Sequence, residues 1–171
     1  MSQDAEKDIS QRDDSPIVKN FIKENPYKDW KLDKVYCSPL LRAQQTAEAL
    51  FGEYETVDYI YEYIRPRMLD GVPRKEAKLF WDKHKTESTT DPDWNYDESE
   101  SFNTIVKRAN KFYKHLQTLK YSRLSVVGHG IFFTHLMSIH ALGVDNYTID
   151  KYYKLSLYIR QNPLQYLYME L

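Results

Sequence analysis

The chain has 171 residues, 42% of them hydrophobic, and a formal net charge of −1, a length and composition that predict one soluble globular domain. The balanced charge excludes a nucleic-acid surface that works by bulk electrostatics, and no run approaches the ~20 apolar residues of a membrane span. The single cysteine, Cys37, excludes an internal disulfide and a multi-cysteine metal site.

The first 15 residues are acidic and polar, which is untypical of a signal peptide and predicts a flexible N-terminal arm. We therefore expect a cytoplasmic protein whose single domain covers residues 16–171. Apolar residues at helical spacing predict a helix over 17–22, which ends at Asn25-Pro26. A strand is predicted over 35–37, and a buried, inert Cys37 thiol is favoured there over a reactive one.

The later elements alternate between helices and strands. After Pro39 a helix is predicted, then a strand over 56–60 and a helix around 75–84; the polar stretch over 86–101 is interpreted as a surface excursion. The clearest helix carries one apolar stripe, made of Phe102, Ile105, Val106, Ala109, Phe112, Tyr113 and Leu116. A strand over 124–127 precedes a helix that starts at Ile131, and two β-like runs, 154–160 and 165–171, predict a C-terminal hairpin. The order indicates an α/β sandwich.

The first candidate site is the segment from Ser38 to Ala43. Ser38 is suited to be a helix N-cap and Pro39 to be the first helical residue, which places Arg42 in the opening turn. A cation at that positive end is mildly unfavourable, and an anion bound by helix amides and guanidinium reverses the sign. The alternative is an arginine that extends to solvent or pairs with Glu48 or Asp33.

The second candidate site is Gly128-His129-Gly130, at the end of the strand over 124–127. Ligands of open α/β sheets bind at the carboxyl ends of strands. The glycines allow an anion to approach the backbone, Gly130 leaves the amides of the next helix uncovered, and His129 can donate hydrogen bonds to phosphate near neutral pH. The alternative is a histidine that only caps the strand. His84, His115, His135 and His140 lack such a setting.

Together these segments resemble the histidine phosphatase superfamily, the phosphoglycerate-mutase-like proteins. The stretch CSPLLRAQQTAEAL (37–50) is similar to the family's S-P-x-x-R-A-x-x-T-A segment, and VVGHG (126–130) is similar to its second-histidine segment. Glu100-Ser101-Phe102 with Arg108 resembles the opening of the helix before that strand, and DSPIVKNFIKEN (14–25) resembles the family's D-S-P-L-T helix. The resemblance covers roughly residues 14–142. It implies a three-layer α/β/α sandwich with a mostly parallel sheet.

The resemblance also implies phosphomonoester hydrolysis through a phosphohistidine, on a small phosphorylated substrate and with no cofactor or metal. In that mechanism a first histidine attacks phosphorus, a carboxylic acid protonates the leaving oxygen, and arginines with a second histidine hold the phosphoryl oxygens. Arg42 matches an arginine of this set, His129 the second histidine, and Glu62 the acid. Ser38, Gly128 and Gly130 are assigned to substrate binding. For Glu62 the alternative is a glutamate at a strand end that faces water.

One element of the family pattern is absent from the printed sequence, because no Arg-His pair occurs in it. We therefore expect the first strand, with its nucleophilic histidine, to be missing. Three explanations stay open: a truncated or mis-started active enzyme, a non-catalytic relative that binds phosphoanions, or a strand supplied by another chain. An incomplete sheet also predicts a tendency to oligomerise, with no nucleic-acid or membrane partner.

Overall fold

The computed structural model describes residues 25–69, 71–73, 75–159 and 169. Its contacts divide the chain into two compact units. Among the described residues, one unit, which we call the sheet unit, contains residues 25–61 together with Leu119–His129. The other, the helical unit, contains the described residues of Glu62–Thr118 and those from Gly130 onward. The N-terminal arm, the helix predicted over 17–22 and most of the run over 165–171 lie outside the described residues.

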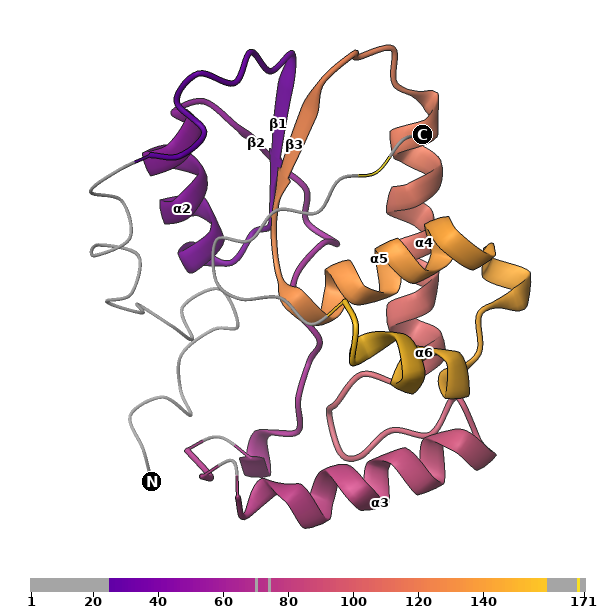
Figure 1. Ribbon diagram of the computed structural model, residues 1–171. Coiled ribbons are helices and arrows are strands. Elements are labelled where there is room, and N and C mark those ends of the chain that lie inside the picture. The colour runs from indigo at the N-terminus through magenta and orange to yellow at the C-terminus, as the bar shows by residue number, and fades with distance from the viewer. Residues whose placement is uncertain (1–24, 70, 74, 160–168, 170–171) are drawn as a thin grey trace. The chain divides into compact units, whose positions relative to one another are not determined.

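The sheet unit is built on three parallel strands, β1 (Lys34–Cys37), β2 (Glu55–Thr56) and β3 (Leu124–Val127), in the order β2-β1-β3 (Figure 1). Cys37 pairs in register with both Thr56 and Val127. All three strands therefore end at the same edge of the sheet, which is where ligands of α/β proteins bind. The predicted α/β class with a parallel sheet is confirmed.

Helix α2 (Leu41–Phe51) follows β1 and packs its small side chains on the sheet. Ala43 and Ala47 form a core cluster with Cys37, and Tyr54 and Val127 pack against it. The Cys37 thiol is fully buried, and burial raises its pKa to about 12, so the inert thiol is the correct interpretation.

The strand predicted over 56–60 is much shorter in the structure. β2 consists of Glu55–Thr56, and the ladder continues only through the Val57 amide, which donates to the Cys37 carbonyl at 2.8 Å. After Val57 the chain turns, and the Ile60 amide bonds back to the Val57 carbonyl. The β-branched and aromatic residues were read as strand formers, but Val57 and Ile60 are buried by this turn instead.

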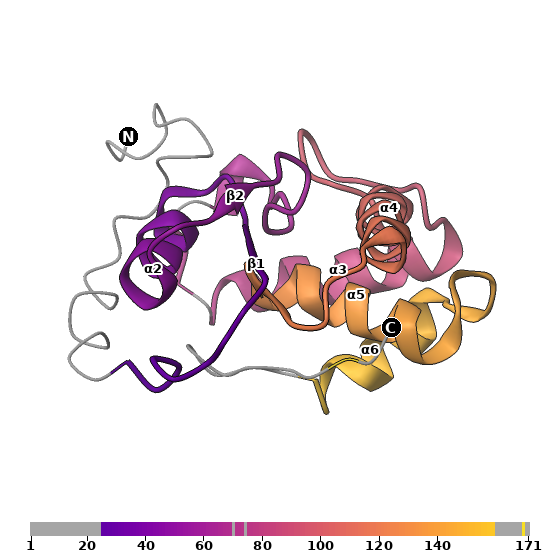
Figure 2. The same ribbon diagram turned by 90° about the horizontal axis from the view of Figure 1, so that it is seen from above.

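The helical unit contains α3 (Ala77–Thr90), α4 (Phe102–Thr118), α5 (Gly130–Leu142) and α6 (Ile149–Ser156), with short 3-10 turns η3 (Arg67–Leu69) and η4 (Val144–Asn146). α5 lies between α4 and α6 and contacts both (Figure 2). The predicted apolar stripe of α4 is buried except for the half-buried Tyr113. No helix within the described ranges combines the length and apolar character needed to cross a membrane.

Two predictions in this unit need correction. The helix predicted around 75–84 continues to Thr90, so the first residues of the polar stretch are helical and not part of a surface loop. The run predicted as a strand over 154–160 is the end of α6 as far as Ser156, and the amides of Tyr158 and Ile159 still bond to the Leu155 carbonyl. Helical spacing of the apolar residues here outweighed their β propensity.

Candidate functional site

Ser38 and His129 come together at the carboxyl edge of the sheet. Ser38 directly follows β1, His129 follows β3, and the Ser38 amide continues the ladder by donating to the Val127 carbonyl at 2.9 Å. The Ser38 hydroxyl and His129 Nε2 form a hydrogen bond of 2.7 Å, and both residues are buried. Two segments that are 91 residues apart in sequence therefore meet at one point.

The detailed role predicted for Ser38 is wrong, since the N-cap of α2 is Leu40 and Pro39 lies before the helix. The amides of Ala43 and Gln44 bond to the Leu40 carbonyl, so the helix starts two residues later than predicted. The Ser38 hydroxyl instead accepts from the Leu40 amide at 3.3 Å and bonds to His129. The Ser38 hydroxyl therefore bonds to a residue that is distant in sequence and does not cap α2, the role that its local sequence favours.

Arg42 is the second residue of α2 and half-buried, so its predicted position in the opening turn is confirmed. The first turn of α2 contains no acidic residue. Arg42 and the helix N-terminus therefore place positive charge at the same end of α2, which favours an anion there. Asp33, one alternative partner, precedes β1 at its other end, where its carboxylate accepts from the amides of Ser122 and Arg123 at 2.8 and 2.9 Å.

In the helical unit, the carboxylate of Glu62 is held by three backbone amides. Glu62 Oε1 accepts from Tyr63 at 2.8 Å and from Phe132 at 3.2 Å, and Oε2 accepts from Ile131 at 3.2 Å. Ile131 and Phe132 open α5, so Glu62 is bound to a helix N-terminus, and its side chain is half-buried. The expectation that Gly130 leaves these amides uncovered is therefore wrong, because a side chain of the same unit occupies them.

Gly130 itself is exposed as the first residue of α5, and a Cβ at this position would meet no atom within 4 Å. Gly128, the other glycine assigned to substrate binding, is half-buried.

Glu100 and Arg108 form a buried, two-pronged ion pair that supports the Glu62 segment. Arg108 Nε and Nη2 donate to Glu100 at 2.5 and 2.7 Å. Arg108 Nη2 also reaches the Glu62 carbonyl at 3.4 Å, and the Glu100 amide donates to the Ile64 carbonyl at 3.0 Å. The pair thus fixes the backbone next to Glu62. The sequence carried a signal for it, since Arg108 lies one turn after Ile105 on the buried face of α4.

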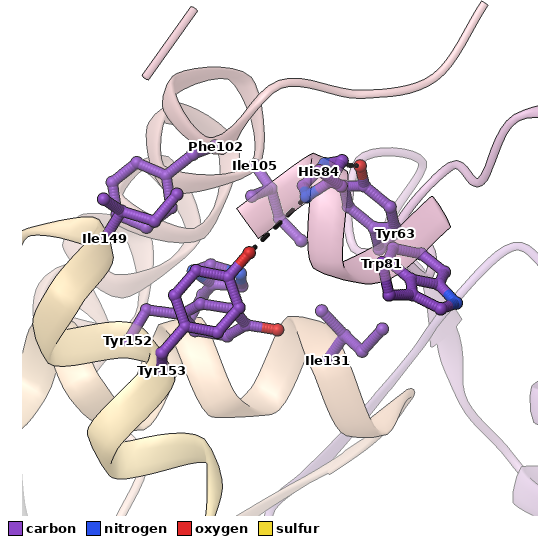
Figure 3. A pocket seen from close by; sticks show the side chains of 10 residues that line it. Tyr63, Trp81, His84, Phe102, Ile105, Ile131, Ile149, Tyr152 and Tyr153 are labelled. Carbon is purple, nitrogen blue, oxygen red and sulfur yellow. Dashed lines mark hydrogen bonds between the residues drawn. The ribbon is translucent and has the colours of Figure 1, made fainter. Parts of the chain in front are cut away.

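The sequence did not indicate a functional setting for His84 or His135. Both line one cavity of the helical unit, with a volume of about 60 Å³ (Figure 3). His135 is 2% exposed; its Nδ1 bonds to the Tyr147 hydroxyl at 2.9 Å and its ring stacks on Tyr152. Burial first, and the nearby Arg108 charge second, lower the pKa of His135 to about 3. Burial also lowers the pKa of His84. Both rings are neutral at physiological pH.

The donor types that hold metals do not gather anywhere in the described part of the chain, where no group of three or more histidine, cysteine, aspartate or glutamate side chains could bind an ion. The candidate residues supply hydrogen bonds and charge: an arginine at a helix N-terminus, a histidine at a strand end, and an oriented carboxylate.

A serine, an arginine and a histidine thus lie at the carboxyl edge of a parallel sheet, an arrangement suited to bind an anion. The family model of the histidine phosphatase superfamily (branch 1) matches residues 24–158, and the chain belongs to this superfamily.

Two solved structures are similar to the chain. One is assigned as an alpha-ribazole-5'-P phosphatase from Escherichia coli K-12, with 17% identity and a TM-score of 0.55 over 74% of this chain and 63% of that one. The other is the alpha-ribazole phosphatase from Shigella flexneri, with 18% identity and a TM-score of 0.52 over the same shares. The chain thus spans 63% of the length of these proteins. Identities this low establish a shared fold alone. No curated protein matches the chain.

Proposed function

We propose that this chain carries the phosphate-binding and acid residues of a phosphomonoester hydrolase that works through a phosphohistidine. His129 and Arg42 hold the phosphoryl oxygens, and Glu62 protonates the leaving oxygen. The observation that supports the proposal most directly is the 2.7 Å hydrogen bond between Ser38 and His129. This bond joins the segments around Ser38 and His129 at one edge of the sheet, and as evidence it is independent of the sequence resemblance.

The roles follow from the chemistry of each group. The Ser38 hydroxyl orients the His129 ring, because a short, buried hydrogen bond leaves little freedom of rotation. Arg42, with its planar guanidinium, suits two-pronged recognition of a phosphoryl group, and the α2 N-terminus adds to its charge. Such preorganised donors stabilise the charge that develops on the phosphoryl oxygens during transfer.

In the proposed reaction, a histidine nitrogen forms a bond to phosphorus while the ester P–O bond breaks. The leaving oxygen takes its proton from Glu62, and a water molecule then cleaves the P–N bond to release phosphate. We assign no residue of this chain as the attacking histidine, because no Arg-His pair occurs in the printed sequence. We therefore expect the chain as printed to bind phosphoanions and to turn over phosphomonoesters negligibly.

Binding of inorganic phosphate or vanadate tests the proposal directly. The Arg42→Ala variant should lose about 1.5–3 kcal/mol of binding, roughly one to two decades in affinity, in calorimetry or phosphorus NMR. Arg123→Ala is the matched control, since Arg123 is an exposed arginine of the same unit just before β3, at the opposite end of that strand from His129. Equal binding by Arg42→Ala and Arg123→Ala would refute the role of Arg42.

The second candidate function is a phosphoanion-binding domain without turnover, favoured by the absence of an Arg-His pair from the printed sequence. The two candidates differ in one experiment: the chain is assayed with an aryl phosphate beside a version extended by its upstream codons, if these encode an Arg-His segment. Activity that appears only with the extension supports the hydrolase. Full activity of the chain as printed would contradict both this account of the nucleophile and the binding-only function.

A further inference from the structure

Arg108 contacts both parts of the hydrogen-bonded cap that Glu62 forms on α5. Its Nη2 reaches the Glu62 carbonyl at 3.4 Å, and its guanidinium carbon lies over the ring of Phe132, 5.1 Å from the ring centroid. Phe132 belongs to the first turn of α5, and its amide donates to Glu62 Oε1. One side chain of α4 therefore touches the backbone of Glu62 and also the helix end that binds the Glu62 carboxylate.

These contacts suit the shape of a guanidinium group. The group is planar, carries its donors around its edge, and packs its face on aromatic rings. Nε and Nη2 donate to Glu100, Nη2 also reaches the Glu62 carbonyl, and the group as a whole lies over Phe132. An ammonium group is a single point charge on a flexible stem. A lysine at position 108 therefore cannot make all of these contacts at once.

Glu100 fixes both Arg108 and the chain that follows Glu62. The Ile64 amide donates to Glu100 Oε2 at 3.4 Å, and the Glu100 amide donates to the Ile64 carbonyl at 3.0 Å. The backbone over residues 62–64 is thus held at its first residue by Arg108 and at its last by Glu100. Arg108 and Glu100 are 7% and 4% exposed, so water competes little for these bonds.

Stability alone does not account for this pair. The attraction between two buried charges often does no more than offset the cost of removing them from water, and apolar side chains of similar size can stabilise a fold equally well. An apolar pair, however, could not bond to the Glu62 carbonyl. The contacts of Arg108 with Glu62 and Phe132 are the part of the arrangement that requires a guanidinium group.

We propose that Arg108, held by Glu100, is a positioning residue for the proposed acid: it keeps the Glu62 carboxylate on the amides of Ile131 and Phe132. The inference rests on the proposed function, because it takes Glu62 as the group that protonates the leaving oxygen. It concerns the helical unit alone, to which all five residues belong. Proton transfer depends on the direction of the acid, and a carboxylate that left these amides would lose its fixed direction.

The test follows the amide signals of Ile131 and Phe132 by NMR as the pH of the full chain is lowered. A carboxylate that takes up a proton becomes a weaker acceptor, so both signals should shift in the parent chain. Glu62→Gln removes the titrating group and should abolish the shift, which assigns the shift to Glu62. The same titration is run on Arg108→Lys and on the double variant Glu100→Gln with Arg108→Met. We expect both variants to lose most of the shift.

The double variant separates positioning from a merely structural role. It leaves no buried charge without a partner, so it should unfold in urea near the parent midpoint, yet it lacks the bond to the Glu62 carbonyl. Arg108→Lys keeps a cation beside Glu100 and is the second variant. Arg67→Lys is the matched control, because the same substitution on an exposed arginine paired with Glu98 at 2.8 Å should leave the shift unchanged.

Three results overturn the inference. One is a parent chain without any acid-dependent shift of the two amides, which would mean that Glu62 is not bound there. Another is a shift that survives in the folded Arg108→Lys or double variant. The third is loss of the fold in both variants, which would show that the pair is structural. A folded variant that has lost the shift supports the inference.

Binding of inorganic phosphate to the same variants separates this inference from the proposed function. In that function Arg42 and His129 hold the phosphate, so we expect Arg108→Lys to bind phosphate as tightly as the parent. If neither binds phosphate while the amide shift is lost in Arg108→Lys, the proposed function falls and Arg108 still holds Glu62. If both bind phosphate and the shift is unchanged in Arg108→Lys, the positioning role falls and the proposed function stands.

Discussion

Protonation of His135 at acidic pH should destabilise the folded protein, and the loss of stability can be calculated from the pKa of this residue. Its pKa falls from 6.5 in the unfolded chain to about 3 in the folded protein. Between these values the unfolded chain binds one more proton than the folded protein, so the stability that neutral His135 allows is present above pH 6.5 and is lost as the pH falls. The slope for one group is ~1.4 kcal/mol per pH unit, hence about 2 kcal/mol between pH 7.5 and 5.

The groups around His135 explain why it stays neutral. Tyr147 bonds to Nδ1, Tyr152 stacks on the ring at 4.4 Å, and Phe102 lies at 5.7 Å, so protonation would place a charge among buried aromatic rings. The positive charge of Arg108 opposes it further. A loss of 2 kcal/mol is a large part of the ~5–15 kcal/mol that stabilises an ordinary domain.

The assay is urea unfolding at pH 7.5, 6 and 5 for the parent, His135→Gln and His115→Gln, where His115 is a half-buried histidine near the end of α4. Glutamine at 135 keeps an acceptor for Tyr147 and does not titrate, so this variant should lose up to ~1.4 kcal/mol per pH unit of the acid slope. His84, whose pKa is also lowered, keeps a part of the slope in every variant. The slope, and not the stability at pH 7.5, is the readout. Identical slopes in the parent and His135→Gln would refute the reasoning.

Two further predictions concern buried groups. Glu100→Gln leaves Arg108 without its buried counter-charge and should reduce the free energy of unfolding by about 3–5 kcal/mol, whereas the double change with Arg108→Met should recover much of this loss; urea unfolding measures both. Cys37, with its thiol fully buried, should react with a thiol reagent only as fast as the protein unfolds, and a native-state reaction as fast as in denaturant would contradict its burial.

The fold was predictable where local pattern and packing agree. The stripe of α4 and the strands around Cys37 and Val127 follow from hydrophobic periodicity. The C-terminal run over 154–160 was mispredicted because tyrosine and leucine fit a strand or a helix equally, and contacts of α6 with α3 and α5 decide between them.

The site was predictable in part, for a different reason. A motif states which residue types occur together, but not which hydrogen bonds they choose when several are within reach. Ser38 was expected to cap α2 and bonds to His129 instead. The first amides of α5 were expected to be free to bind an anion, and they donate to the carboxylate of Glu62 instead. Both choices depend on residues that are distant in sequence and become neighbours only after folding.

The hydrogen bonds of Glu62 identify which of its oxygens can act as the acid. Oε1 already accepts two amides, whereas Oε2 accepts one and has a lone pair left. If Glu62 transfers a proton, it does so from Oε2, on the side of Ile131 and the cavity.

The Glu62→Gln variant tests this geometry. The glutamine carbonyl can replace Oε1, but its NH2 group then faces the Ile131 amide, so that two donors point at each other. Unfolding should then cost about 1–3 kcal/mol less than in the parent. Glu98→Gln, on an exposed carboxylate paired with Arg67, is the control and should change stability by under ~0.5 kcal/mol. Equal stability of the two variants would mean that Glu62 does not cap α5, and the choice of Oε2 as the proton donor would fall with it.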